Sequence, residues 1–211
     1  MTVVKDARER LVSGSGALGL HLAPESIDRL LQYRDLMVRW NRIHNLTAIR
    51  DPEAMLTHHL LDSLAISPYV SGARVLDVGS GAGLPGIPLA VTQPQRQFVL
   101  LDASAKRVSF LRQTVVELKL HNVEAVHARI ERYRPTAPFA TVTSRAFAAL
   151  RDFVASAQPL LAPGGHLLAM KGRCPDEELQ ALPVGIRVHA VIGLKVPGLD
   201  AQRHLIDLVR A

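Results

Sequence analysis

The chain has 211 residues, of which 48% are hydrophobic and 21% charged, a composition typical of a globular protein with a sizeable core. Its single cysteine, Cys174, excludes an internal disulfide and a thiolate zinc cluster. No apolar run approaches the roughly 20 residues of a membrane span, and the charged N-terminus excludes a secretory signal, so we expect a cytoplasmic protein. The net charge of +6 suits a polyanionic partner such as nucleic acid, but 20 of the 25 basic residues are arginines spread along the chain, which codon usage alone would also produce.

The first part of the chain is predicted to be helical. Between residues 24 and 44, apolar side chains recur at helical spacing, and Trp40 belongs to this stripe. Asp51 is a typical N-cap with Pro52 at the first helical position, and the helix that it starts should extend to about Ser67. We therefore expect residues 1–70 to form an N-terminal helical extension.

From residue 71 onward, strand-like and helix-like patterns alternate. The expected strands are 74–78, 97–102, 123–128, 139–144 and 166–172. One helix is expected from a glycine-rich loop to about residue 91, and two more over 105–120 and roughly 147–161. This alternation implies right-handed crossovers between parallel strands, which is the pattern of a doubly wound sheet.

Two further extended runs, 186–194 and 203–209, follow a short helical turn near 176–182. Only eight residues separate them, too few for a helical crossover, so they should pair antiparallel. The predicted class is α/β, with a seven-stranded, doubly wound, Rossmann-like sheet over residues 71–211 whose last strand is antiparallel. This arrangement resembles the class I S-adenosylmethionine-dependent methyltransferase fold.

The loop "GSGAGLPG", residues 79–86, has four glycines directly after the first predicted strand. Gly81-x-Gly83-x-x-Gly86 matches the dinucleotide fingerprint, and Asp102 lies where a ribose-binding acid would stand. The other register, Asp77-x-Gly79-x-Gly81-x-Gly83, resembles the methyltransferase loop, with Asp102 again on the ribose of the cofactor. A tight turn without a ligand would need only one or two glycines.

The rest of the chain favours the methyltransferase register. The seven strands leave no room for the substrate domain of a dehydrogenase. No tyrosine is followed by a lysine at helical spacing, as the short-chain dehydrogenases would require. A nicotinamide cofactor and a purely structural loop stay as minor alternatives.

Six segments make the resemblance specific: "NLTAI", "HHLLDSL", "DVGSGAGLPGIPLA", "LLDASAKRVSFLR", "SRAFA" and "MKG". In this order and spacing they are similar to the bacterial small-subunit (16S) rRNA guanine-N7 methyltransferase G family, also called glucose-inhibited division protein B. The similarity runs from about Trp40 to "QRHLIDLV" and so covers most of the chain.

The resemblance implies methyl transfer from S-adenosylmethionine to N7 of guanine 527 in the 530 loop, with 16S rRNA or the small ribosomal subunit as partner. It also implies that the cofactor contacts Gly79 and Leu84 in the loop, Ile130 and Glu131 after the third strand, and Arg145 after the fourth. Arg145 is at the same time the candidate catalytic residue, since it could present its planar fork to the guanine or to the cofactor carboxylate. Gly81 and Asp102 are added from the general pattern of the fold.

Guanine N7 has an in-plane lone pair and no proton, so its methylation needs alignment rather than a general base. The lack of a catalytic triad in this sequence agrees with that chemistry. Cytosine C5 methylation is the rival, because it needs a cysteine nucleophile, and Cys174 follows the fifth predicted strand with Lys171 and Arg173 nearby to lower its pKa. The other motifs of that rival family are missing.

Several further residues have an ordinary structural interpretation. His58 and His59 are adjacent on a helix and have no third ligand at metal-binding spacing, so we expect no metal, and Asp62 is expected to bond one of the two. Trp40 is expected in the core rather than as a base-stacking platform. The cations of the helix after Asp102, at positions 106, 107 and 112, fit a solvated face and RNA phosphate contacts equally well.

Two alternatives of other classes stay open at this point. One is an RNA-binding or ribosome-assembly factor that keeps the methyl-donor fold without activity, against which the intact loop and Asp102 argue. The other is a methyltransferase for a small molecule or a protein, which would show no salt-dependent affinity for RNA.

Overall fold

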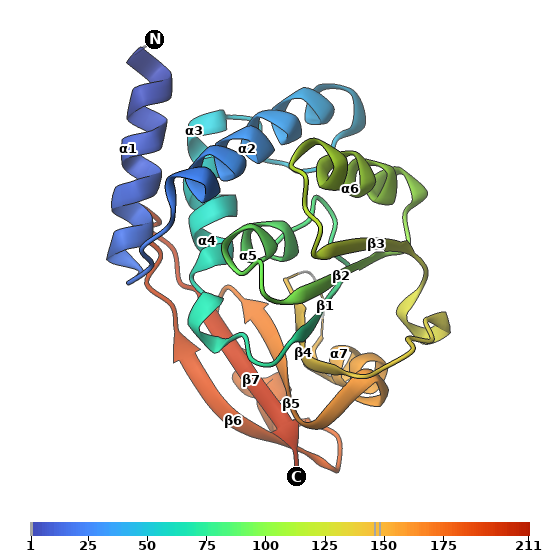
Figure 1. Ribbon diagram of the computed structural model, residues 1–211. Helices are drawn as coiled ribbons and strands as arrows, with labels where there is room; N and C mark the ends of the chain where they lie inside the picture. Colours follow the sequence, from blue (N-terminus) through green and yellow to red (C-terminus); the bar gives the residue numbers. More distant parts are fainter. Residues whose placement is uncertain (1, 146, 148) are drawn as a thin grey trace.

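A seven-stranded β-sheet runs through the centre of the computed structural model, which describes residues 2–145, 147 and 149–211 (Figure 1). The strand order is β3-β2-β1-β4-β5-β7-β6. Strands β1 to β5 are parallel, and β7 lies antiparallel between β5 and β6. The strands are β1 (Arg74–Val78), β2 (Gln97–Asp102), β3 (Val123–His127), β4 (Phe139–Ser144), β5 (Leu161–Lys171), β6 (Ile186–Gly193) and β7 (His204–Arg210). The predicted fold class is confirmed, including the antiparallel hairpin.

The segment between β4 and β5 differs from the prediction. Helix α7 (Leu150–Ala157) is shorter than 147–161, because Pro159 lies in a 3-10 turn, η4 (Gln158–Leu160), and cannot continue the α-helical hydrogen bonding. Strand β5 begins at Leu161 rather than at 166, and its pairing register with β4 shifts between Phe139 and Thr141. Gly164, with φ +70°, gives this bulged segment the backbone freedom that it needs.

Helices cover both faces of the sheet. One apolar cluster packs on the face of Val75 and Leu100, and the other on the face of Leu76 and Leu101, so the side chains alternate as in any strand. The first face is covered by α2 (Pro24–His44), α5 (Gly86–Thr92) and α6 (Ala105–Glu117), which lie together beside β1–β3 (Figure 1). Helix α7 packs on the second face, with η3 (Ile130–Arg132) and α8 (Asp176–Gln180) near it.

The N-terminal helices share a core with the sheet. Helix α1 (Thr2–Ala17) packs on α2, and apolar residues from both lie in the same cluster as the sheet residues of the first face. Trp40 is partly buried and meets the ring of Phe110 at 5.4 Å between centroids, so it packs against the core rather than standing free as a stacking platform. None of the helices in the described ranges is both long and apolar enough to cross a lipid bilayer.

A further helix with an irregular middle leads into the sheet. Asp51 caps it by accepting hydrogen bonds from the backbone N–H groups of Glu53 and Ala54, as predicted. The helix consists of α3 (Pro52–Met55), a π-helical turn, η1 (Leu56–Leu61), and α4 (Asp62–Leu64), and the 3-10 turn η2 (Ser67–Tyr69) follows. Such π turns are frequent at functional sites.

Candidate functional site

The glycine loop joins β1 to α5 at the carboxyl edge of the sheet. The backbone N–H groups of Gly79 and Ser80 donate to the carbonyl oxygen of Leu101 at 2.8 and 3.1 Å, which pins the loop to the end of β2. Gly79, Gly81 and Gly83 have φ angles of +66°, +62° and +90°. Only glycine adopts this conformation at little cost, so the loop needs glycine at all three positions.

The four glycines serve two different purposes. A Cβ atom at Gly83 would lie 2.6 Å from the Ile87 side chain, and one at Gly86 would lie 2.2 Å from that of Leu100. Gly86 therefore lets α5 pack closely on the sheet, and Gly83 lets the loop pack closely against the helices on that face. A Cβ at Gly79 would meet no atom within 4 Å, and one at Gly81 only a backbone oxygen at 3.8 Å. Gly79 and Gly81 thus leave open space in which a ligand could approach the backbone.

Asp77 stabilises the loop from inside. Its side chain is fully buried, and its Oδ2 atom accepts hydrogen bonds from the Ser80 hydroxyl and, at 3.0 Å, from the Gly86 N–H. Burial raises the pKa of this carboxyl from 3.8 to about 6. Its Oδ1 atom is buried without a partner among the residues described. Asp77 therefore stabilises the conformation of the glycine loop through its hydrogen bonds to Ser80 and Gly86.

Helix α2 also holds the loop. Tyr33 is completely buried, and its hydroxyl donates a hydrogen bond to the carbonyl oxygen of Ala82. Burial raises the pKa of Tyr33 well above 10, so that the hydroxyl keeps its proton. The same hydroxyl oxygen would lie 3.2 Å from a Cβ at Gly83. The N-terminal helices thus contribute directly to the shape of the loop.

A small cavity of about 190 Å³ lies over the carboxyl ends of β1 and β2. Four of the predicted site residues line it, namely Gly79, Asp102, Ile130 and Glu131. This is the edge at which open α/β sheets bind ligands. The other three predicted residues do not line it: Gly81 donates its N–H to Asp102 at 2.9 Å, Leu84 is buried in the core, and Arg145 lines a neighbouring cavity.

Asp102 has capacity for further hydrogen bonds. Its Oδ2 atom accepts from Gly81 and lies 3.5 Å from Nη1 of Arg107, and its Oδ1 atom accepts from the Ser104 N–H at 2.8 Å. Each carboxylate oxygen has two acceptor lone pairs, so both can accept one more donor from a ligand. The ion pair also gives Arg107, which sequence reasoning left undecided, a contact beside this cavity.

A larger cavity of about 430 Å³ lies beside the first, where β4 and β5 end and β7 begins. It also reaches the π-helical turn and the loop before α3. Its polar lining consists of Thr47, His58, His59, Asp62, Arg145, Lys171, Arg203 and His204. Sequence reasoning named Arg145 as a site residue but gave no signal for Arg203, which lies 141 positions from Asp62 in the chain.

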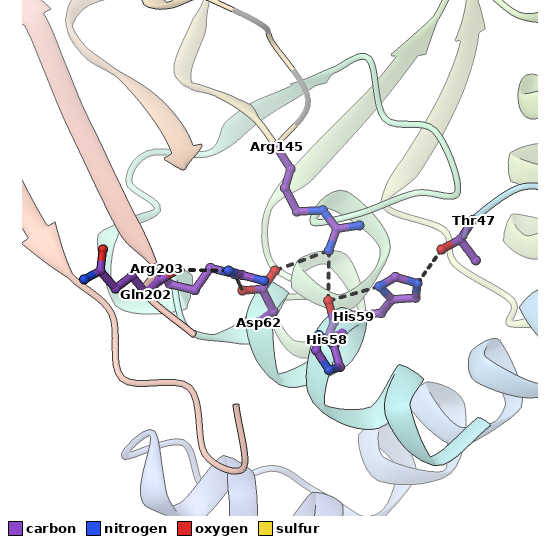
Figure 2. Close-up of polar contacts among 7 residues, drawn as sticks. All are labelled: Thr47, His58, His59, Asp62, Arg145, Gln202 and Arg203. Carbon is purple, nitrogen blue, oxygen red and sulfur yellow. Dashed lines mark hydrogen bonds and ion pairs between the residues drawn. The ribbon is translucent and has the colours of Figure 1, made fainter. Parts of the chain in front are cut away.

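Asp62 joins two arginines in this cavity (Figure 2). Its Oδ2 atom accepts from Nη1 of Arg145 at 3.3 Å, and its Oδ1 atom accepts from Nε of Arg203 at 3.0 Å. Nη1 of Arg145 also donates to the carbonyl oxygen of His58 at 3.2 Å. The expectation that Asp62 bonds one of the two histidines was therefore wrong, because both oxygens face guanidinium groups instead.

His59 is a buried, neutral member of the same network. Its Nδ1 atom lies 3.0 Å from the carbonyl oxygen of His58, and its Nε2 atom lies 2.8 Å from the Thr47 hydroxyl. A carbonyl can only accept, so Nδ1 carries the proton and the Thr47 hydroxyl donates to Nε2. Burial, and then the charge of Arg145, lower the pKa of His59 from 6.5 to about 4. Over the described ranges, no three histidine, cysteine or acidic side chains are grouped so that they could hold a metal ion.

Replacing His59 with glutamine should remove a pH dependence of stability. In the unfolded chain His59 takes up a proton below about pH 6.5, whereas in the folded chain it does so only near pH 4. The folded state therefore loses stability as the pH falls through this window. Relative to His59→Gln, the free energy of unfolding of the wild type should drop by about 2 kcal/mol between pH 7 and pH 5 in urea titrations. His121→Gln, at an exposed position, is the control. If the wild type lost as much stability relative to His121→Gln, the pH dependence could not be assigned to His59.

Cys174 lies outside both cavities. Its thiol donates to Oδ1 of Asp176 at 3.1 Å, and this hydrogen bond raises the pKa of the thiol above its ordinary value. Lys171, which would lower that pKa in the cytosine C5 alternative, has its Nζ atom 3.1 Å from the Glu178 carboxylate. The contacts of Cys174 and Lys171 therefore argue against the cytosine C5 alternative, in which the thiol would be activated.

Comparison with known families and proteins agrees with this geometry. The family GidB, described as rRNA small subunit methyltransferase G, matches residues 26–206. The ribosomal RNA small subunit methyltransferase G of Ectopseudomonas mendocina is 48% identical over 213 residues, which cover 100% of both chains. The protein of the same name from Laribacter hongkongensis is 50% identical and covers 95% of this chain and 97% of its own.

Solved structures share the fold at low sequence identity. A SAM-dependent methyltransferase from Aquifex aeolicus superposes with a TM-score of 0.58 at 18% identity, covering 78% of this chain and 97% of its own. A TehB-like SAM-dependent methyltransferase from Corynebacterium glutamicum gives the same TM-score at 15% identity, over 85% and 98% of the two chains. At such identities the likeness is one of fold.

Proposed function

This chain belongs to the rRNA small subunit methyltransferase G family, and from that premise we propose that it transfers a methyl group from S-adenosylmethionine to N7 of a guanine in 16S rRNA, guanine 527 of the 530 loop. The observation that carries the proposal is the family match over residues 26–206, which includes the glycine loop and every polar residue lining the larger cavity. The net charge of +6 suits a polyanionic partner. We place this activity in the cytoplasm, where ribosomal subunits occur.

We propose that the cofactor lies along the glycine loop, with contacts to Gly79, Gly81, Leu84, Asp102, Ile130, Glu131 and Arg145. The open space above Gly79 and the unused acceptor capacity of Asp102 fit a nucleoside with two ribose hydroxyls. When bound, S-adenosylmethionine supplies the electrophilic methyl group. The cavity of about 190 Å³ would hold the adenosine end of the cofactor, and Arg145 would complete the site on the side of the larger cavity.

The chain's own residues would then act by alignment. Guanine N7 reacts through its lone pair, so no residue has to remove a proton. Two acid–base groups of the larger cavity agree with this, since both oxygens of Asp62 accept from arginines and His59 bonds on both nitrogens. Holding nucleophile, methyl carbon and sulfur in line can contribute on the order of 7–11 kcal/mol to lowering the barrier.

Two experiments separate this proposal from its alternatives. Mapping N7-methylated guanines in 16S rRNA from cells with and without the protein should show one guanine whose modification depends on it. Calorimetric titration with S-adenosylmethionine should show binding in either case. Binding without any dependent guanine would favour an inactive assembly factor, and RNA affinity independent of salt would favour a methyltransferase with another substrate.

Replacing Cys174 with serine should leave most of the methyl transfer intact. Methylation at N7 forms no covalent adduct with the protein, and the thiol lies outside both cavities. The rate of tritiated-methyl incorporation into 16S rRNA, compared between the wild type and the variant, measures this directly. A folded variant without activity would bring back methylation at cytosine C5.

A further inference from the structure

The structure assigns the larger cavity to the acceptor nucleotide, and we propose that Asp62 is the positioning residue that aligns Arg145 and Arg203 into one binding site for an RNA phosphate beside the target guanine. The inference rests on the proposed function and adds to it the place of the acceptor and the residues that hold it. It follows from the position of the cavity, its charge and the contacts of Asp62.

The two cavities occupy neighbouring strand ends. Strand β4 pairs with β1, and the hydroxyl of Ser144 at the end of β4 donates to the carbonyl oxygen of Val78 at 2.9 Å. Gly79 follows Val78 on one side, and Arg145 follows Ser144 on the other. Neighbouring strands lie about 4.8 Å apart, so a group bound over β4 would lie next to a cofactor held at the glycine loop. Donor and acceptor would thus meet at the switch point of the sheet.

The charge of the larger cavity suits an anion. Asp62 is almost completely buried, whereas the side chains of Arg145 and Arg203 are each 26% exposed, so the carboxylate lies behind and the two guanidinium groups in front. The group of three has a net charge of +1. In the described part of the chain, Nε and Nη2 of Arg145 and Nη2 of Arg203 have no hydrogen-bond partner. These donors are free for a ligand with several acceptor oxygens.

A phosphate fits these donors better than the reactive edge of the base does. An arginine bound to both O6 and N7 of guanine would engage the lone pair that must attack the methyl group. A phosphodiester leaves N7 free and matches the guanidinium fork. Ile49, Met170 and Leu194 line the same cavity and offer an apolar surface to the base. Enzymes that modify a base commonly hold it out of its stack in such a pocket.

The contribution of Asp62 is then geometric. Its negative charge repels a phosphate, so charge alone would make RNA binding tighter in its absence. Its two oxygens instead fix the orientation of two side chains, one directly after β4 and one directly before β7 (Figure 2). Asp62→Asn raises the net charge of the cavity by one unit without changing the size of the side chain. RNA affinity should rise in this variant if the charge of Asp62 dominates, and should fall if its alignment of the two arginines dominates.

The test measures affinity of the full chain for transcribed 16S rRNA and for small subunits lacking the modification, in a salt series without cofactor. Arg203→Gln should make the plot of log affinity against log salt shallower by about 0.7–0.9, and Arg203→Lys should keep the wild-type slope. Asp62→Asn should weaken RNA binding at least fivefold in spite of its added positive charge. Asp207→Asn is the matched control, since Asp207 is also buried and is paired at 2.8 Å, but with His166 outside both cavities.

Affinity for S-adenosylmethionine should stay at the wild-type value in Arg203→Gln, Arg203→Lys and Asp207→Asn. An unchanged slope in Arg203→Gln, or RNA binding in Asp62→Asn that equals or exceeds that of the wild type, would overturn the inference. Equal losses of RNA affinity in Asp62→Asn and Asp207→Asn, with equal decreases in melting temperature, would also overturn it, because the effect would then be a general loss of structure. A wild type that binds RNA but methylates no guanine would refute the proposed function, which this binding experiment does not measure.

Discussion

Replacing Asp102 with alanine is expected to weaken binding of S-adenosylmethionine about a hundredfold while the chain stays folded. Two charge-assisted hydrogen bonds to the ribose hydroxyls are worth roughly 1.5–3 kcal/mol each. The substitution also frees the Gly81 N–H, which Asp102 holds at 2.9 Å, and so loosens the loop that the cofactor would follow. Calorimetric titration of the purified variant measures the loss.

Two further variants show whether the effect is local. Asp152→Ala removes an exposed acid from α7 and should bind the cofactor like the wild type. Asp102→Asn keeps an acceptor oxygen without the charge and should fall between the wild type and the alanine variant. Wild-type affinity in a folded Asp102→Ala would remove this carboxylate from the cofactor site.

The second large effect is a contrast between two glycines of one loop. Gly86→Ala should reduce the free energy of unfolding by about 3 kcal/mol, because its Cβ would lie 2.2 Å from the Leu100 side chain and 2.7 Å from Oδ2 of Asp77. Gly79→Ala should reduce the free energy of unfolding by only about 1–2 kcal/mol, because alanine adopts the left-handed backbone conformation of this position at that cost. Its affinity for the cofactor should nevertheless fall at least tenfold. Its methyl group would project into the space proposed for the ligand.

Gly164→Ala is a matched control for Gly79→Ala. Gly164 has a φ of +70° against +66°, and a Cβ at either position meets no atom within 4 Å, yet Gly164 lies in β5 away from the loop. Urea titration and calorimetry on the three variants should separate strain, overpacking and ligand exclusion. Equal losses of cofactor affinity in Gly79→Ala and Gly164→Ala would show that the open space above Gly79 is not a ligand site.

Features that depend on local pattern could be predicted from the sequence. Alternating apolar runs gave the strands, a short connection gave the hairpin, and the glycine spacing gave the loop and its neighbour Asp102. Arg145 could be named because it directly follows a predicted strand. The start of β5 could not, because the bulge at Gly164 depends on how β4 and β5 pair.

The larger cavity was harder to predict because its contacts are long-range. Asp62 and Arg203 are 141 positions apart, and Asp62 and Arg145 are 83 apart, so no sequence motif joins them. The spacing of Asp62 and the two histidines suggested a local bond, yet two guanidinium groups compete better for a buried carboxylate than a neutral imidazole does. Likewise, nothing near Tyr33 in the sequence indicates that its hydroxyl reaches Ala82.

The hydrogen bond from Tyr33 to Ala82 couples the order of α2 to the binding of a ligand at the glycine loop. Moving α2 away from the loop would leave a buried carbonyl unpaired, at a cost of about 1–3 kcal/mol. The coupling is reciprocal. If displacement of α2 lowers the affinity for the ligand by some factor, then the bound ligand opposes displacement of α2 by the same factor. Amide hydrogen exchange in α2 should therefore be slower with ligand bound at the glycine loop than without it, although α2 itself need not touch the ligand.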